Sequence, residues 1–229
     1  MSKLSEMYHN YLGSKQKWLQ FSLYLFGIVI SSLGLALLVI STVGVAPGDS
    51  VALGLSKRFD IKIGYLLIIG FIVLVLVNAK IEGKRPRFES LLPILLRGWT
   101  LNLWLYNVLN NTRIDVLWAQ WGVFVIGVVF MGLGIGMYLR APFPHIPVDH
   151  FMMIVNEKTN QSKRVVRILF EFALAGLGLY LGGWDVVGLG TVITALFLGP
   201  IIQYFYEITG FVERLSHSKA SKKQDSVLE

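Results

Sequence analysis

The stretch "APGDSVALGL" (46–55) separates two long apolar runs and decides how the chain is interpreted. Residues 18–48 carry no charge, and 63–79 form a second charge-free run. Between these runs the chain places Pro47 where a helix would begin, a position at which proline is favoured. A carboxylate, Asp49, follows two residues later. We therefore expect the first apolar helix to break here and a short helix carrying an acid to follow.

Composition predicts a membrane protein. The chain has 229 residues, of which 54% are hydrophobic and 15% charged, whereas soluble domains carry roughly 25% charged residues. The net charge of +7 does not indicate nucleic-acid binding, because the basic residues flank apolar runs, as the positive-inside rule describes, and no soluble domain with a basic face is visible. There are no cysteines, so disulfides and thiolate chemistry are excluded.

Six apolar runs are long enough to cross a bilayer, which takes about 20 helical residues. They lie within 18–48, 63–79, 90–109, 116–139, 168–184 and 186–206. Two further pieces, 47–58 and 147–158, make about 18 Å of helix each and are too short for a hydrocarbon core of about 30 Å.

The second short piece repeats the first. It lies within "HIPVDHFMMI" (145–154), where Pro147 and Asp149 follow Pro47 and Asp49 at a spacing of 100 residues. Without a gap, the same spacing pairs further positions: Gly27 with Gly127, Leu33 and Gly34 with Leu133 and Gly134, and Ile68 with Ile168. We interpret the chain as a duplicated unit, 18–109 and 116–208, between an N-terminal segment, 1–17, and a polar tail, 211–229, that we expect to be largely disordered.

Whether the short pieces span the membrane decides the topology. If they are re-entrant, each repeat has three spans and the second repeat is inverted; if they span, the repeats are parallel. The loop charges hardly discriminate, but the length favours re-entrant pieces, and the basic loop "KIEGKRPR" (80–87) lies inside only in that arrangement. The sequence therefore predicts an all-α polytopic protein of the bacterial cytoplasmic membrane, with two inverted repeats and both termini in the cytoplasm.

The second half, "GLGIGMYLRAPFPHIPVDHFMM" and the segment from 159 to 200, resembles the bacterial YczE/YyaS/YitT-type integral membrane proteins. The resemblance covers most of 20–208. It rests on five features: Pro147 with Asp149, Arg167 with Glu171, the pair Gly182-Gly183, the run Gly188 to Thr191, and Gly199-Pro200. The first half fits through "APGDSVALGL" but has "RFESLLPILLRGW" in place of the G-x-G-T motif. The resemblance implies a fold and a membrane location, without a substrate.

The two aspartates are the first candidates for a binding site. An acid at the bilayer centre costs about 2.5–3.5 kcal/mol on insertion scales, so Asp49 and Asp149 are expected to have a functional or a structural role. One interpretation is a cation, proton or polar-solute site, shared by the residues that follow them, Ser50 and His150. The other is local, because each acid lies near the third helical position, where it complements the helix dipole and accepts a free backbone N–H.

Three further charged residues lie within apolar runs. Arg167 and Glu171 are four residues apart and lie on one helical face. They are expected to form a structural ion pair or, alternatively, a gate or proton relay. Arg97 stands within the third span and must reach the membrane surface, a water-filled cavity or an acid. A partner such as Asp149 or Glu171, or a substrate anion, is the hypothesis for it.

Nothing in the sequence predicts a cofactor or an enzyme. His145 and His150 flank Asp149, which is weak support for a metal site. The glycine run "GLGIGM" (132–137) lies inside a span with no strand before it, so helix packing explains it better than a dinucleotide loop. No nucleophile with a supporting base is present.

Inverted repeats with broken helices are typical of secondary transporters, whose sites lie near the midplane. We therefore predict a permease or secondary transporter for a small solute or ion, with Asp49 and Asp149 at a central cavity and Arg97 or the Arg167–Glu171 pair controlling access. The alternative is a membrane-embedded regulatory or assembly partner that transports nothing and docks through its basic tail. The bilayer and a small solute are the expected partners, with a homo-oligomer as a further possibility.

Overall fold

The computed structural model describes the backbone of residues 3–110, 112, 114–159 and 163–228, and side chains over the same ranges except 3–16, 149, 152–153, 163–164 and 212–228. All regular structure in the described residues is helical. The elements are α1 (Lys3–Ser41), α2 (Pro47–Phe59), α3 (Ile63–Glu82), a 3₁₀ turn (Phe88–Ser90), α4 (Leu91–Leu103), a π-helical turn (Trp104–Val108), α5 (Leu117–Arg140), α6 (Pro147–Thr159), α7 (Lys163–Gly182), a 3₁₀ turn (Gly183–Asp185) and α8 (Leu189–Leu228).

Five helices in the described residues are long and apolar enough to cross a membrane. Their apolar parts are Lys17–Ser41, Ile63–Glu82, Leu117–Arg140, Val165–Asp185 and Leu189–Phe211. The chain is therefore a multi-pass helical membrane protein, and the short helices α2 and α6 each begin at the predicted proline.

The sixth expected span, 90–109, is divided. Its α-helical part, α4, has 13 residues, which is about 20 Å. The chain then widens into the π-helical turn, where the N–H of Leu109 donates to the carbonyl of Trp104 at 2.7 Å. Such turns interrupt α-helices locally. In this turn, the indole N–H of Trp104 donates a hydrogen bond to the carbonyl of Val29 on α1 at 3.2 Å.

The core is formed where α1 crosses α5 through glycines. A Cβ atom added to Gly27 would lie 2.7 Å from the carbonyl oxygen of Gly134, and one added to Gly127 would lie 3.0 Å from that of Gly34. Backbones this close exclude larger side chains, as small residues do at helix contacts in lipid. Around this pair, α4 packs on α1 and α8 on α5, while α2 packs on α7 and α6 on α3.

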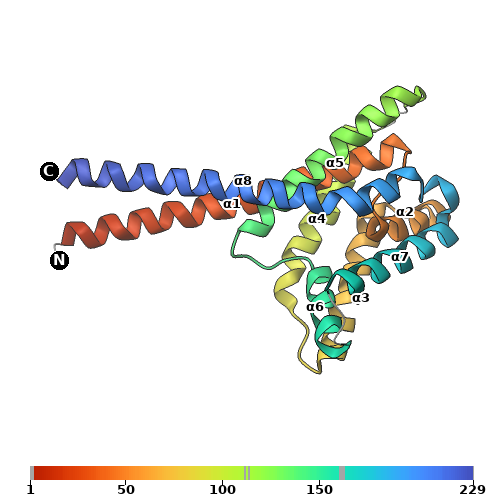
Figure 1. Cartoon of the computed structure of the whole chain (residues 1–229), viewed down its shortest axis with the longest axis horizontal. Coiled ribbons are helices and arrows are strands. Elements are labelled where there is room, and N and C mark those ends of the chain that lie inside the picture. Colours follow the sequence, from red (N-terminus) through yellow and green to blue (C-terminus); the bar gives the residue numbers. More distant parts are fainter. Residues whose placement is uncertain (1–2, 111, 113, 160–162, 229) are drawn as a thin grey trace.

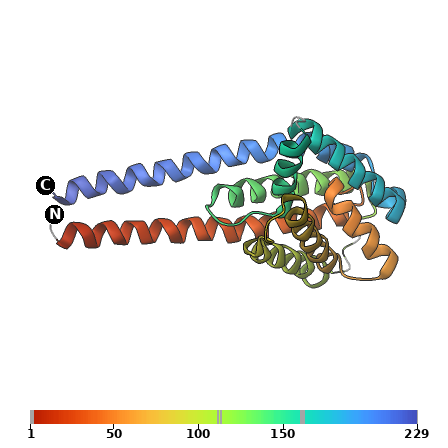
Figure 2. The same ribbon diagram turned by 90° about the horizontal axis from the view of Figure 1, so that it is seen from below.

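The backbone of α8 is helical to Leu228, through most of the polar tail, and α1 begins at Lys3. The sequence after Gly210 has neither glycine nor proline, so nothing interrupts the helix once it is started. Both extensions leave the helical body on the same side and run next to each other (Figures 1 and 2).

Candidate functional site

The start of α2 holds a buried ion pair. Ala46 provides no side-chain cap, and its carbonyl accepts from the N–H groups of Asp49 and Ser50 at 2.9 and 3.0 Å. Oδ1 of Asp49 lies 3.4 Å from Nη2 of Arg97 on α4, and the two side chains are only 7% and 6% exposed. Asp49 therefore complements the dipole of its own helix while it pairs with a cation on another helix.

Arg97 has a different partner from the one hypothesised. The acids proposed for it were Asp149 and Glu171, but the structure pairs it with Asp49. The reason is tertiary: α4 is fixed against α1, where the hydroxyl of Ser32 donates to the carbonyl of Arg97 at 3.2 Å and Thr100 donates to Ser32 at 2.8 Å. Nε of Arg97 is buried and has no partner among the described residues.

Ser50 closes the start of α2 against α7. Its hydroxyl donates to the carbonyl of Pro47 at 2.7 Å and lies 3.4 Å from the carbonyl of Leu174. Ser50 is fully buried, and Gly178 on α7 faces it so closely that a Cβ atom there would collide with its hydroxyl. Ser50 is therefore packed directly against α7.

The start of α6 is contacted by α3 through side chains. Nδ2 of Asn78 donates to the carbonyl of Pro147 at 2.9 Å, and Asn78 is 2% exposed. Its Oδ1 is buried without a hydrogen-bond partner among the described residues. Near it, Nε2 of His150 lies 3.3 Å from Oε2 of Glu82.

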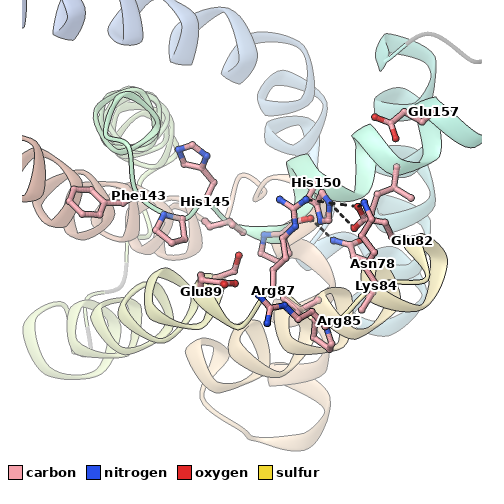
Figure 3. Close-up of a pocket in the computed structure, with 18 residues that line it drawn as sticks. Asn78, Glu82, Lys84, Arg85, Arg87, Glu89, Phe143, His145, His150 and Glu157 are labelled. Carbon is pink, nitrogen blue, oxygen red and sulfur yellow. Dashed lines mark hydrogen bonds and ion pairs between the residues drawn. The ribbon is translucent and has the colours of Figure 1, made fainter.

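A cavity of about 650 Å³ opens at this second start (Figure 3). Apolar side chains and prolines make up part of its wall, and charged side chains and histidines make up the rest. The lining residues are Val75, Asn78, Ala79, Glu82, Lys84, Arg85, Pro86, Arg87, Glu89, Ser90, Phe143, Pro144, His145, Ile146, Pro147, His150, Ile154 and Glu157.

Glu82 is the centre of the charged cluster in this wall. Its carboxylate lies 2.6 Å from Nζ of Lys84 and 4.0 Å from Nη2 of Arg87, besides the contact with His150. Partial burial lowers the pKa of the His150 imidazole below its usual range, and Arg87 acts in the same direction, whereas Glu82 opposes both. His150 is thus favoured in the neutral form at physiological pH.

The remaining predicted residues lie elsewhere. Arg167 and Glu171 form the expected i,i+4 pair on α7, with Nε and Oε1 2.9 Å apart, and the Arg167 side chain is 46% exposed. The backbone of Asp149 lies in the first turn of α6, while its side chain is outside the described residues. Asp49, Ser50 and Arg97 are brought together, but they do not line the cavity that contains His150.

Sequence reasoning missed Asn78 and Glu82. The available indication for Asn78 was that it is the one amide in the charge-free run 63–79, where a polar side chain needs a partner. Glu82 lies just after that run, within the basic loop 80–87, and its partners are fixed only by the fold. Among the described residues, no group of three or more side chains with metal-ligand chemistry lies together.

Comparison with known proteins places the chain in a family. Residues 18–207 match the model of a "Family of unknown function (DUF6198)", so the chain belongs to that family. It is similar to the "Uncharacterized protein YyaS" of Bacillus subtilis (strain 168), with 30% identity over 201 residues that cover 88% of this chain and 98% of YyaS. The predicted resemblance is thereby confirmed.

Two further relatives are of similar length. The "Uncharacterized membrane protein YczE" of Bacillus subtilis (strain 168) is 27% identical over 190 residues, covering 81% of this chain and 85% of YczE. An "Uncharacterized protein" of Haemophilus influenzae is 30% identical over 202 residues, covering 86% of each chain. No solved structure matches the chain.

Proposed function

We propose that this member of the family is a permease for a small solute in the bacterial cytoplasmic membrane. The observation that carries the proposal is the difference between the two short helices: one begins in a cavity of about 650 Å³, and the other begins in a packed, buried ion pair. A transporter that opens to one side at a time has this asymmetry in each of its end states.

Reciprocal packing supports the inverted repeat in this proposal. Gly27 contacts Gly134, and Gly34 contacts Gly127. Because Gly127 and Gly134 lie 100 residues after Gly27 and Gly34, each glycine meets the counterpart of the other one, as across a two-fold axis. Likewise, each short helix packs on the long helix of the other half, α2 on α7 and α6 on α3. The halves are then three crossings each, with α4 and its π-helical turn as the third crossing of the first half.

In the proposed cycle, one repeat rocks against the other and the two ends exchange states. Residues of the basic loop 80–87 line the cavity, and the positive-inside rule supports a cytoplasmic position for this mouth. The opposite end is closed by the contact of Ser50 with Gly178 and by the Asp49–Arg97 pair. Opening that end separates α2 from α7 and frees Asp49 and Arg97 to meet the solute.

Flux into proteoliposomes tests the proposal with a mixture of candidate solutes. Purified protein is reconstituted, incubated with amino acids, sugars, organic acids and cations, and washed, and the trapped solutes are identified by mass spectrometry. At least one solute is expected to accumulate above empty liposomes, and far less with the double variant Asp49→Leu/Arg97→Met. The absence of any enriched solute overturns the permease.

A second candidate function is a membrane-embedded assembly partner. The helical extensions of α1 and α8 favour it, because they project together beyond the candidate spans and offer a docking element outside the membrane. Deletion of 212–229 separates the two functions. If the protein is a permease, the deletion leaves solute flux unchanged. If it is a docking protein, the deletion has the same effect on the cell as loss of the whole protein, even though Asp49 and Arg97 are intact.

A further inference from the structure

Two side-chain contacts hold the start of α6 to the end of α3. Nδ2 of Asn78 donates to the carbonyl of Pro147 at 2.9 Å, and Oε2 of Glu82 lies 3.3 Å from Nε2 of His150 (Figure 3). Positions 78 and 82 are about one helical turn apart, so both contacts leave the same face of α3. Glu82 and His150 line the cavity, and their side chains are 18% and 17% exposed, so water and protons reach both.

The matching positions at the other short helix carry no titratable side chain. One hundred residues after Asn78 and Glu82, α7 has Gly178 and Gly182, and the α2 residues that face these glycines are Ser50 and Gly54. A Cβ atom at Gly54 would lie 3.1 Å from the backbone nitrogen of Gly182, so α2 and α7 meet backbone to backbone. At these matched positions, the contact between α3 and α6 is the one that can change its charge with pH.

The surroundings of His150 oppose a positive charge in three ways. His150 is the fourth residue of α6, where the partial positive charge of the helix N-terminus disfavours a cation. The carboxylate beside it, on Glu82, is already 2.6 Å from Nζ of Lys84 and 4.0 Å from Nη2 of Arg87, so a charged imidazole would be a third cation at one carboxylate. Partial burial removes water that would otherwise stabilise the charge.

The charged groups that act on His150 come from three segments. They are Glu82 on α3, Lys84 and Arg87 in the loop after it, and Glu157 on α6. The other titratable residues of the cavity wall are Arg85, Glu89 and His145, and the side chain of Asp149 lies outside the described residues. Burial is the largest influence and lowers the pKa of the His150 imidazole, the two basic residues act in the same direction, and the two acids oppose them. The neutral imidazole therefore suits this wall better than the protonated one.

We propose that His150 is a proton-binding site whose protonation releases α6 from α3 and widens the cavity. When the imidazole takes up a proton, the neighbouring cations and the helix N-terminus repel it, and the side chain moves into water. Glu82 keeps Lys84 as its partner, so the contact between the two helices is lost without leaving the carboxylate unpaired. Such a protonation switch acts on the helix contact alone. The inference thus goes beyond the proposed permease and does not require transport.

Distances between spin labels on the full-length protein in lipid nanodiscs test the proposal. Because the chain has no cysteine, Lys80→Cys with Lys158→Cys labels exposed positions of α3 and α6, and Arg58→Cys with Tyr180→Cys labels exposed positions of α2 and α7 as the control pair. Double electron–electron resonance at pH 8 and pH 5 is expected to show a longer α3–α6 distance at pH 5 and a constant α2–α7 distance. An unchanged α3–α6 distance, or equal changes in both pairs, overturns the proposal.

Variants in the α3–α6 labelled protein assign the change to one residue. His150→Gln stays neutral and is expected to lose the distance change, whereas His145→Gln, at the other histidine of the cavity wall, keeps it. His150→Lys is charged at both pH values and is expected to show the long distance already at pH 8. A change that persists in His150→Gln, or disappears in His145→Gln, overturns the assignment, and these two variants decide even where His150→Lys does not fold.

The outcomes separate the proton site from the permease. A longer α3–α6 distance at pH 5 without solute accumulation in proteoliposomes leaves the proton site in place and overturns the transport function. Accumulation of a solute with a constant α3–α6 distance leaves transport in place and overturns the proton site.

Discussion

The two short helices α2 and α6 begin with the same Pro-x-Asp sequence but have opposite surroundings. At the start of α2, Ser50 is fully buried against Gly178. At the start of α6, His150 lines a cavity and Asn78 reaches the helix from α3. Residues 78 and 178, like 50 and 150, are separated by the same 100 residues as the two prolines, and the side chains at these positions differ.

The shared proline fixes where each short helix begins, whereas the neighbouring side chains differ between the two starts. In both halves the carbonyl of the helix-initiating proline accepts a hydrogen bond, from Ser50 in the first and from Asn78 in the second. A hydroxyl on the same helix does this without separating α2 from α7. In the second, the donor is an amide from the neighbouring helix α3, and the side chains of Glu82 and His150 lie 3.3 Å apart between the same two helices.

Cysteine accessibility gives the largest expected contrast. Because the chain has no cysteine, Ser50→Cys and His150→Cys each provide a single thiol, and a small methanethiosulfonate reagent is expected to react at least roughly tenfold faster at position 150. The reason is packing: one site is sealed and the other lines an open cavity. Gly83→Cys, in an exposed loop, serves as the fully reactive control, and similar rates at 50 and 150 contradict the comparison.

Charge removal at the closed end has the next effect. Asp49→Asn is expected to lower the free energy of unfolding by about 3–5 kcal/mol, because it leaves the buried guanidinium of Arg97 without its partner. The double variant Asp49→Leu/Arg97→Met restores most of that stability, since apolar replacement of a buried pair is often neutral. Unfolding in mixed micelles measures both. At the open end, Glu82→Gln is expected to have a much smaller effect, because water screens its partners.

Gly178 tests the close approach of α2 to α7. Gly178→Ala is expected to destabilise the protein by about 1–3 kcal/mol, the usual cost of overpacking, because its methyl group meets Ser50. Gly176→Ala is the matched control two residues away on the same helix, where nothing lies within 4 Å of the added atom; it is neutral or stabilises the helix by up to about 1 kcal/mol. Equal effects of the two variants contradict the sealed contact.

The smallest effect is a pH dependence at the open end. The lowered pKa of His150 means that the unfolded chain binds its proton first as the pH falls. Neutral His150 therefore contributes fully to the stability of the folded protein above the ordinary histidine pKa of roughly 6.5. This contribution is lost as the pH falls through the lower pKa that His150 has in the folded protein. Thermal unfolding of the unmodified protein is expected to drop more between pH 8 and pH 5 than that of His150→Gln, by the equivalent of about 1 kcal/mol or less. Parallel curves contradict this, since the charged groups around His150, namely Glu82, Lys84, Arg87 and Glu157, are the same in both proteins.

Much of the fold follows from local sequence. The helix starts at Pro47 and Pro147 are those predicted, because proline at the first helical turn is a local preference, and the ion pair of Arg167 with Glu171 follows from helical periodicity. Five of the six predicted spans appear as long helices. The exception, 90–109, is interrupted where Trp104 bonds to α1, a contact that no local pattern contains.

The candidate site was predictable only in part. An acid after each proline and a lone arginine in a span indicated buried polar groups, but not that Asp49 and Arg97 meet each other. The cavity is built from the end of α3, the loop after it and the start of α6, which are far apart in sequence. Oδ1 of Asn78 is buried without a hydrogen-bond partner among the described residues, and no sequence pattern indicates this.

By itself, the sequence determined that the chain is helical, membrane-embedded and twice interrupted, because hydrophobicity and proline act over a few residues. Only the tertiary structure decided which helices pack together, that Asp49 pairs with Arg97, and that the cavity lies at the start of α6. Those outcomes depend on atoms brought within a few ångströms by the crossing of α1 and α5 at their glycines, and the geometry of a crossing is a property of the pair of helices rather than of either one.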